Sequence, residues 1–179
     1  MEKRSSTCCF TGHRPEKLPW GYQEADPRCQ ALKRRIADAV SAAYDQGYRH
    51  FICGMAQGCD LYFCESVLAL RQRHGDLLLE AALPCPTQAR RWPARERERH
   101  ARLLAACDLE TMVSETYTPY CMQRRDRYMV DHASLLIAAY DGTAGGTQYT
   151  MLYAMRRGVS IVDLDILPRT RAPLSRHQK

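Results

Sequence analysis

The sequence has no long hydrophobic run. Its longest uncharged and mainly apolar stretch covers residues 133–140, whereas a membrane-spanning helix needs about 18 to 20 apolar residues. The chain is therefore not expected to span a membrane. The N-terminal residues lead into a short apolar run at Cys8 without a long apolar segment or a small-residue cleavage site. No secretory signal is indicated, and we expect a cytoplasmic protein.

Closely spaced cysteine pairs, which hold metals or form redox motifs, are also absent. The nine cysteines, an odd number, contain no Cys-x-x-Cys spacing. Several of them, including Cys8, Cys9, Cys53 and Cys64, sit in apolar stretches, which favours buried, reduced thiols. Zinc sites need ligands at short spacing, and Cys59 and Cys64 have no pair of histidines nearby. We therefore predict no metal site.

Acidic residues are missing from the C-terminal stretch 168–179, which carries four basic residues and two prolines. We interpret it as a flexible basic tail that follows a single domain at residues 1–167. Removing its four positive charges from the net charge of +6 leaves +2 for the domain, so DNA binding is expected to be weak and confined to the tail. The arginine-rich run 90–102 fits either a local nucleic-acid patch or a solvated helix face, and we favour the helix face.

Short apolar runs alternate with longer amphipathic segments along the chain. Strands are predicted at residues 7–11, 50–53, 77–83, 110–114, 135–140 and 159–164, and helices at residues 28–46, 59–73, 87–106, 120–133 and 147–157. Pro93 interrupts the pattern of the third helix. Strands that are apolar on both faces and separated by helices are typical of a parallel sheet covered on both sides. We therefore predict an α/β fold, a three-layer αβα Rossmann-like domain with a mostly parallel sheet.

Three of the loops that follow predicted strands combine glycine with polar residues. They are residues 11–15 (Thr-Gly-His-Arg-Pro), 54–60 (Gly-Met-Ala-Gln-Gly-Cys-Asp) and 141–147 (Asp-Gly-Thr-Ala-Gly-Gly-Thr). Open α/β sheets bind ligands at the carboxyl ends of their strands, and the N-terminus of a helix binds anions through its N–H groups. The Gly-Gly-Thr end of the third loop is the best anion-binding candidate, and Arg14 is suited to a phosphate or carboxylate. Asp60 is explained equally well as a helix cap.

Two familiar nucleotide-binding motifs are missing. No Gly-Lys-Ser/Thr sequence follows a glycine-rich loop, so a Walker A site for ATP hydrolysis has no support. The first loop does not match the Gly-x-Gly-x-x-Gly pattern of dinucleotide-binding domains.

Taken together, the motifs present resemble the YpsA-like family of the SLOG superfamily. The resemblance covers about residues 5–165 and is carried by residues 9–18 (Cys-Phe-Thr-Gly-His-Arg-Pro-Glu-Lys-Leu), the second loop, Gln88 with Trp92, residues 124–131 and Gly145-Gly146-Thr147. The superfamily is named for the Smf/DprA DNA-processing proteins and the LOG cytokinin-activating phosphoribohydrolases. Similarity to it implies a Rossmann-like fold with a pocket for a nucleotide-type ligand, and no certain cofactor beyond that ligand.

The resemblance implies a pocket built from the three loops. The ligand-binding residues are expected to be Thr11, Gly12, His13, Arg14, Gly54, Ala56, Gly58, Asp60, Gly145, Gly146 and Thr147. Arg125 or Asp126 would lie at the pocket rim, where the family has an Arg-Asn pair, and an inward Asp126 would repel an anion. Gln88 and Trp92 share a face of the predicted third helix. Trp92 either stacks on a base or packs within the fold, and we favour packing.

The sequence leaves three functions open. The LOG enzymes follow a Gly-Gly-x-Gly-Thr loop with a glutamate, whereas residues 148–162 here contain no carboxylate. We therefore favour a protein that binds a nucleotide or nucleotide derivative as a sensor or regulator. The alternative is a nucleoside monophosphate phosphoribohydrolase, with Asp60, Asp141 or His13 as candidate catalytic residues. DNA binding like that of DprA is a weaker alternative, and a homo-oligomer stays open.

Overall fold

A six-stranded parallel sheet forms the centre of the computed structural model, which describes residues 2–166. The strands are β1 (Thr7–Gly12), β2 (His50–Cys53), β3 (Leu78–Leu83), β4 (Leu109–Met112), β5 (Leu135–Tyr140) and β6 (Ser160–Asp165). Their order is β4-β3-β2-β1-β5-β6, and every neighbouring pair is parallel. The predicted α/β sheet is confirmed, and it is parallel throughout. The predicted tail, residues 168–179, lies outside the described residues.

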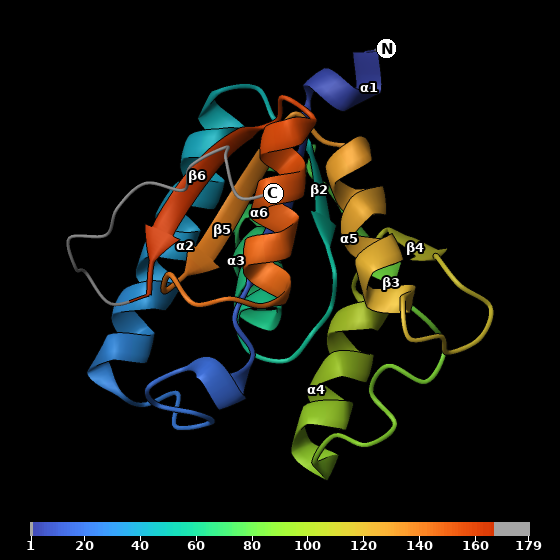
Figure 1. The fold of residues 1–179 in the computed structure, drawn as a ribbon. Helices are drawn as coiled ribbons and strands as arrows, with labels where there is room; N and C mark the ends of the chain where they lie inside the picture. The colour runs from blue at the N-terminus through green and yellow to red at the C-terminus, as the bar shows by residue number, and fades with distance from the viewer. Residues whose placement is uncertain (1, 167–179) are drawn as a thin grey trace.

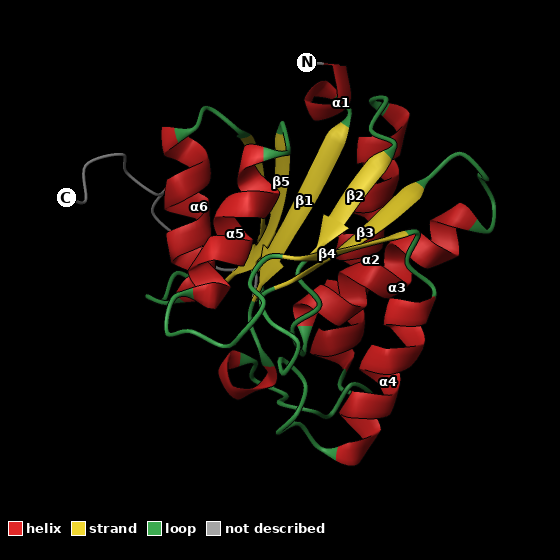
Figure 2. Ribbon diagram, turned by 90° about the vertical axis from the view of Figure 1, so that its right-hand side faces the viewer, coloured by secondary structure: helices red, strands yellow, loops and turns green. Residues whose placement is uncertain are grey.

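Helices cover both faces of this sheet, which gives the three predicted layers (Figures 1 and 2). Helices α2 (Pro27–Asp45), α3 (Cys59–Arg71) and α4 (Ala94–Ala105) lie on one face. Helices α5 (Cys121–Asp131) and α6 (Gly146–Arg156) lie on the other. The short helix α1 (Glu2–Ser5) and the 3-10 turn η1 (Pro15–Lys17) were not predicted. Between residues 2 and 166, none of the helices is both long and apolar enough to cross a membrane.

The longest helix, α2, shows how the sequence sets its own boundaries. Asp26 accepts a hydrogen bond from the backbone N–H of Arg28 at 2.8 Å, which caps the first turn. Leu32, Ile36 and Val40 recur every four residues and are fully buried, so one stripe of the helix packs into the core. Gly47 has a φ of +96°, the left-handed conformation that favours glycine after a helix. The predicted helix at residues 28–46 is therefore confirmed to within one residue.

The predicted helix at residues 87–106 is wrong in its first part. Residues 87–92 form turns, and α4 begins only at Ala94, with Pro93 as its N-cap. Proline has no N–H for the helix and disfavours the helical conformation of the residue before it, Trp92. Because residues 87–92 are not helical, Gln88 and Trp92 do not share a helix face as predicted.

The order of the strands locates the ligand-binding edge of the sheet. From β1 the chain adds β2, β3 and β4 on one side, and then returns to place β5 and β6 on the other side of β1. Strand order therefore reverses between β1 and β5. The register pairs Thr11 with Ala138 and Gly12 with Ala139, so the carboxyl ends of these two strands lie side by side. Open α/β sheets bind ligands in the crevice at such a switch point.

Candidate functional site

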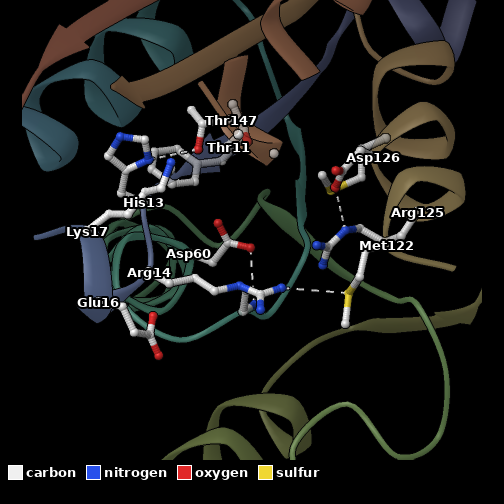
Figure 3. A pocket seen from close by; sticks show the side chains of 16 residues that line it. Thr11, His13, Arg14, Glu16, Lys17, Asp60, Met122, Arg125, Asp126 and Thr147 are labelled. Carbon is white, nitrogen blue, oxygen red and sulfur yellow. Dashed lines mark hydrogen bonds and ion pairs between the residues drawn. The ribbon is translucent and has the colours of Figure 1, made fainter. Parts of the chain in front are cut away.

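A cavity of about 360 Å³ lies at this switch point, beyond the ends of β1 and β5. We call it the switch-point cavity (Figure 3). Its walls come from the three glycine-containing loops and from α5. The predicted ligand-binding residues that line it are Thr11, Gly12, His13, Arg14, Ala56, Asp60, Gly145, Gly146 and Thr147. Gly54 and Gly58, also predicted, and Asp141, a candidate catalytic residue, are not among the lining residues.

The first loop is joined to the third through His13. This side chain is buried, its Nε2 lies 2.6 Å from Oδ1 of Asp141, and its Nδ1 lies 3.2 Å from Oγ1 of Thr147. Partial burial would raise the pKa of Asp141, but the hydrogen bonds from His13 and Thr143 lower it to about 2. Asp141 is therefore an ionised carboxylate that holds His13 and the third loop in place.

Lys17, which sequence reasoning did not assign to the site, lies against the third loop. Its Nζ donates hydrogen bonds to the carbonyl of Ala144 and to Oγ1 of Thr143, and it sits 2.7 Å from where a Cβ on Gly145 would be. Gly145 is the N-cap of α6, and no side chain caps this helix. A cation therefore lies beside a helix N-terminus whose first N–H groups have no side-chain acceptor.

The N-terminus of α3 is occupied in a different way. The carbonyl of His13 accepts the backbone N–H of Cys59 at 3.2 Å, so the first loop itself bonds to this helix end. Gly58, the N-cap, has a φ of +81°, and a Cβ here would lie 2.8 Å from the His13 carbonyl oxygen. Gly58 thus leaves room for the protein's own backbone rather than for the cavity.

Asp60 points into the switch-point cavity instead of capping α3. Its Oδ2 accepts the backbone N–H of Ala56 at 3.1 Å, and no side chain caps the helix. Burial raises the pKa of Asp60 to about 6, although the neighbouring Arg125 guanidinium and the Ala56 N–H both lower it. Asp60 is therefore a carboxyl group whose protonation changes near neutral pH.

Arg125 and Asp126 form a buried ion pair on α5, on the opposite side of the cavity from His13 (Figure 3). Nε of Arg125 donates to Oδ1 of Asp126 at 2.7 Å, and another guanidinium nitrogen donates to the carbonyl of Gly54. A Cβ on Gly54 would clash with that guanidinium, so Gly54 makes room for Arg125. Both members of the pair line the cavity, and Arg125 balances the charge of Asp126.

Five further lining residues were missed by sequence reasoning. They are Phe10, Glu16, Lys17, Met122 and Met129. Glu16 and Lys17 belong to the unpredicted turn η1, which places them over the first loop. The motif at residues 9–18 contained both residues. The sequence did not show that this segment turns back over the first loop, so they were not assigned to the site.

The fold is similar to that of two solved DNA-processing proteins. A structure of DNA processing protein A (DprA) from Streptococcus pneumoniae matches 89% of this chain with a TM-score of 0.57 at 13% identity, and the match spans 50% of that chain. A structure of DprA from Helicobacter pylori, which concerns its single-stranded DNA binding mode, matches 89% of this chain with a TM-score of 0.59 at 11% identity, and the match spans 65% of that chain. These likenesses show the fold.

Sequence relatives match most of the chain. The SPbeta prophage-derived protein YoqJ of Bacillus subtilis is 30% identical over 144 residues, which are 73% of this chain and 84% of YoqJ. A UPF0398 protein of Bacillus licheniformis is 22% identical over 158 residues, 87% of this chain and 86% of that protein. The family described as the YspA SLOG family (YpsA) matches residues 8–163. The chain therefore belongs to the YspA SLOG family, as the resemblance of its motifs implied.

Proposed function

We propose that this protein binds a nucleotide or nucleotide derivative in the switch-point cavity, with the ligand's phosphate at the N-terminus of α6. The observation that carries the proposal is the contrast between two helix ends. Neither helix has a side-chain cap, but the first N–H of α3 bonds to the carbonyl of His13, whereas the first N–H groups of α6 have no such acceptor among the described residues and have Lys17 beside them. Uncapped N–H groups and a nearby cation favour a phosphate.

The charges of the cavity support the same orientation. Lys17 and Thr147 lie on one side of the cavity, and Arg125 with Asp126 lies on the other (Figure 3). The carboxyl group of Asp126 is therefore away from the end where the phosphate is proposed, and that of Asp60 lies between the two sides, beside Arg14 (Figure 3). They face the part of the ligand that carries hydroxyl groups, for which carboxylates are good acceptors. The first part of the ligand is thus a sugar phosphate.

A pair of glycine variants tests this proposal. Gly146 lines the cavity, and a Cβ there meets no atom within 4 Å, so Gly146→Val should fold and fill the phosphate position. Gly75→Val is the matched control, because Gly75 also has open space around a Cβ and lies outside the cavity. We expect nucleoside monophosphates to raise the Tm of the wild type and of Gly75→Val, and not that of Gly146→Val.

Arg14→Ala provides a second arm with Arg34→Ala, an exposed arginine on α2, as its control. Loss of the charge-assisted contact between the Arg14 guanidinium and the phosphate should weaken nucleotide binding about ten- to a hundredfold. If Arg14→Ala and Gly146→Val both keep the wild-type affinity while folded, the ligand does not bind as proposed.

A second candidate function is N-glycosidic hydrolysis, and Asp60 is the observation that favours it. A carboxyl group in the cavity with a pKa of about 6 is suited to general acid or base catalysis. In such a reaction water adds to the anomeric carbon, the bond to the base breaks, and the base leaves with a proton.

We expect binding without hydrolysis, because no carboxylate follows Thr147 before Asp163. The measurement is release of free base from AMP, GMP, CMP and UMP by chromatography. Asp38→Asn is the control, because Asp38 is an exposed acid on α2. If the wild type and Asp38→Asn release base and Asp60→Asn does not, the protein is a hydrolase and the sensor proposal is wrong.

A further inference from the structure

A second cavity lies next to the switch-point cavity. It has a volume of about 370 Å³ and shares Met122 with its neighbour. Two connections build it: the β3–α4 connection contributes Arg90, Arg91 and Trp92, and the β4–α5 connection contributes Tyr117. We call it the aromatic cavity. Each of the two cavities is near the lower end of the 300–1,000 Å³ range of small-molecule sites.

The aromatic rings of this cavity are accessible, and one of them is held in place. Trp92 is half-buried, with His100 packed edge-on against it at 5.2 Å between ring centroids and an interplanar angle of 86°. Tyr117 is 65% exposed. Accessible aromatic side chains that gather around one cavity mark a binding surface. A flat ring in this cavity would meet Trp92, which packs against His100, and the exposed ring of Tyr117.

The charge of the aromatic cavity is positive. Arg90 and Arg91 are exposed, and neither forms an ion pair with any residue between positions 2 and 166. Glu24 and Glu65 instead pair with Arg99, farther along the same arginine-rich run. Guanidinium groups stack on planar rings and donate to their acceptor edges. Rings with acceptor edges, such as nucleobases, suit this lining.

Two contacts join the aromatic cavity to the switch-point cavity. Gln88, which lines the former, donates to the Gly54 carbonyl at 3.0 Å, and this carbonyl also accepts from Arg125 of the latter. Met122 separates the two cavities, with Arg14 in contact with its sulfur at 3.7 Å (Figure 3). Methionine is flexible and adapts to neighbouring groups, so this divider is one that a ligand can displace.

We propose that the aromatic cavity receives the base of the ligand whose phosphate binds at α6. This inference rests on the proposed function and adds the position of the base. The ligand crosses Met122, its sugar lies near Asp60 and Asp126, and its base stacks on Tyr117 and on Trp92, for which the sequence had favoured packing alone. Base stacking on one aromatic side chain contributes enough that its loss lowers affinity about tenfold.

Two tyrosines of equal exposure give a matched test. Tyr117 and Tyr120 are both 65% exposed, but only Tyr117 lines the aromatic cavity. The probes are AMP and ribose 5-phosphate, which has the phosphate and sugar without a base. We expect Tyr117→Ala to weaken AMP binding about tenfold in calorimetry and to leave ribose 5-phosphate binding unchanged. Tyr120→Ala should affect neither probe.

Tryptophan fluorescence provides a direct reading of the base position. The chain has two tryptophans, and Trp20 is 5% exposed, so a stacked base should quench mainly Trp92. AMP is expected to quench the wild-type emission, ribose 5-phosphate to leave it unchanged, and Trp92→Phe to abolish the quenching while keeping AMP bound.

The outcomes separate this inference from the function on which it rests. AMP binding that Gly146→Val abolishes but that neither quenches Trp92 nor responds to Tyr117→Ala would overturn the base position and leave the proposed function intact. If neither AMP nor ribose 5-phosphate binds the wild type, the proposed function fails, and the base position fails with it.

Discussion

At the scale of single residues, Asp60 links the chemistry of the cavity to the stability of the protein. Its pKa of about 6 in the folded protein lies above the value of an aspartate in an unfolded chain. The folded protein therefore binds a proton in the pH range between these two values, where the unfolded chain does not. The contribution of Asp60 to the free energy of unfolding is unfavourable above pH 6 and disappears as the pH falls below about 4.

Asp60→Asn should remove this pH dependence. The gain in free energy of unfolding over the wild type is expected to be about 2 kcal/mol larger at pH 8 than at pH 4.5, because most of the cost of the buried charge arises between these two pH values. Urea unfolding of both proteins at several pH values measures the difference, with Asp38→Asn as the control. A difference that does not change with pH would mean that Asp60 has an ordinary pKa.

The roles of single glycines were the part of the site that the sequence left undecided. A glycine after a strand leaves space, and the pattern is the same whether the space is for a ligand or for the protein. Gly54 accommodates Arg125, which lies 71 residues later in the chain, and Gly58 accommodates the carbonyl of His13. Only Gly12, Gly145 and Gly146 of the predicted glycines line the cavity. The occupants of such spaces come from distant segments, so local spacing does not identify them.

At the scale of elements, the start of α3 depends on a conformation that other residues avoid. Gly58 has φ +81° and ψ −125°, a region that is costly for residues with a Cβ. A Cβ would also meet the His13 carbonyl oxygen at 2.8 Å. The junction between the first loop and α3 is therefore tight.

Gly58→Ala should destabilise the protein by about 2 to 3 kcal/mol, since the backbone strain and the close contact add to each other. Gly75→Ala is the control, because its surroundings are open, and it should change stability by less than about 0.5 kcal/mol. Chemical unfolding at pH 7 measures both variants. Equal effects of the two substitutions would show that the junction is looser than described.

Helices and strands with a clear pattern of apolar residues were predicted well. Element boundaries that depend on a single residue were not. The buried stripe of α2 and the fully buried strand β5 follow from runs of apolar residues. In contrast, the prediction carried the third helix through Pro93, and the structure starts it after that residue. The turn η1 is only three residues long, too short to produce a period. It nevertheless positions Lys17 at the site.

At the scale of the whole molecule, the alternation of strands and helices was sufficient to predict the layers and the parallel sheet. Strand order was not predicted, because an apolar run in the sequence does not show which other strand it pairs with. The site depends on this order, since only the insertion of β5 next to β1 brings the third loop to the first. The expectation that DNA binds weakly and through the tail stays a prediction, and the likeness to DprA does not decide it.

The hydrogen bond between His13 and Thr147 joins residues that are 134 positions apart. During translation, the first two loops therefore emerge from the ribosome long before the third loop is synthesised. Contacts between such distant segments form late, because the chain entropy is lost before the contacts contribute any stabilising free energy. The switch-point cavity is one of the last features that a growing chain completes. Occupancy of that cavity would consequently favour fully folded molecules over their precursors.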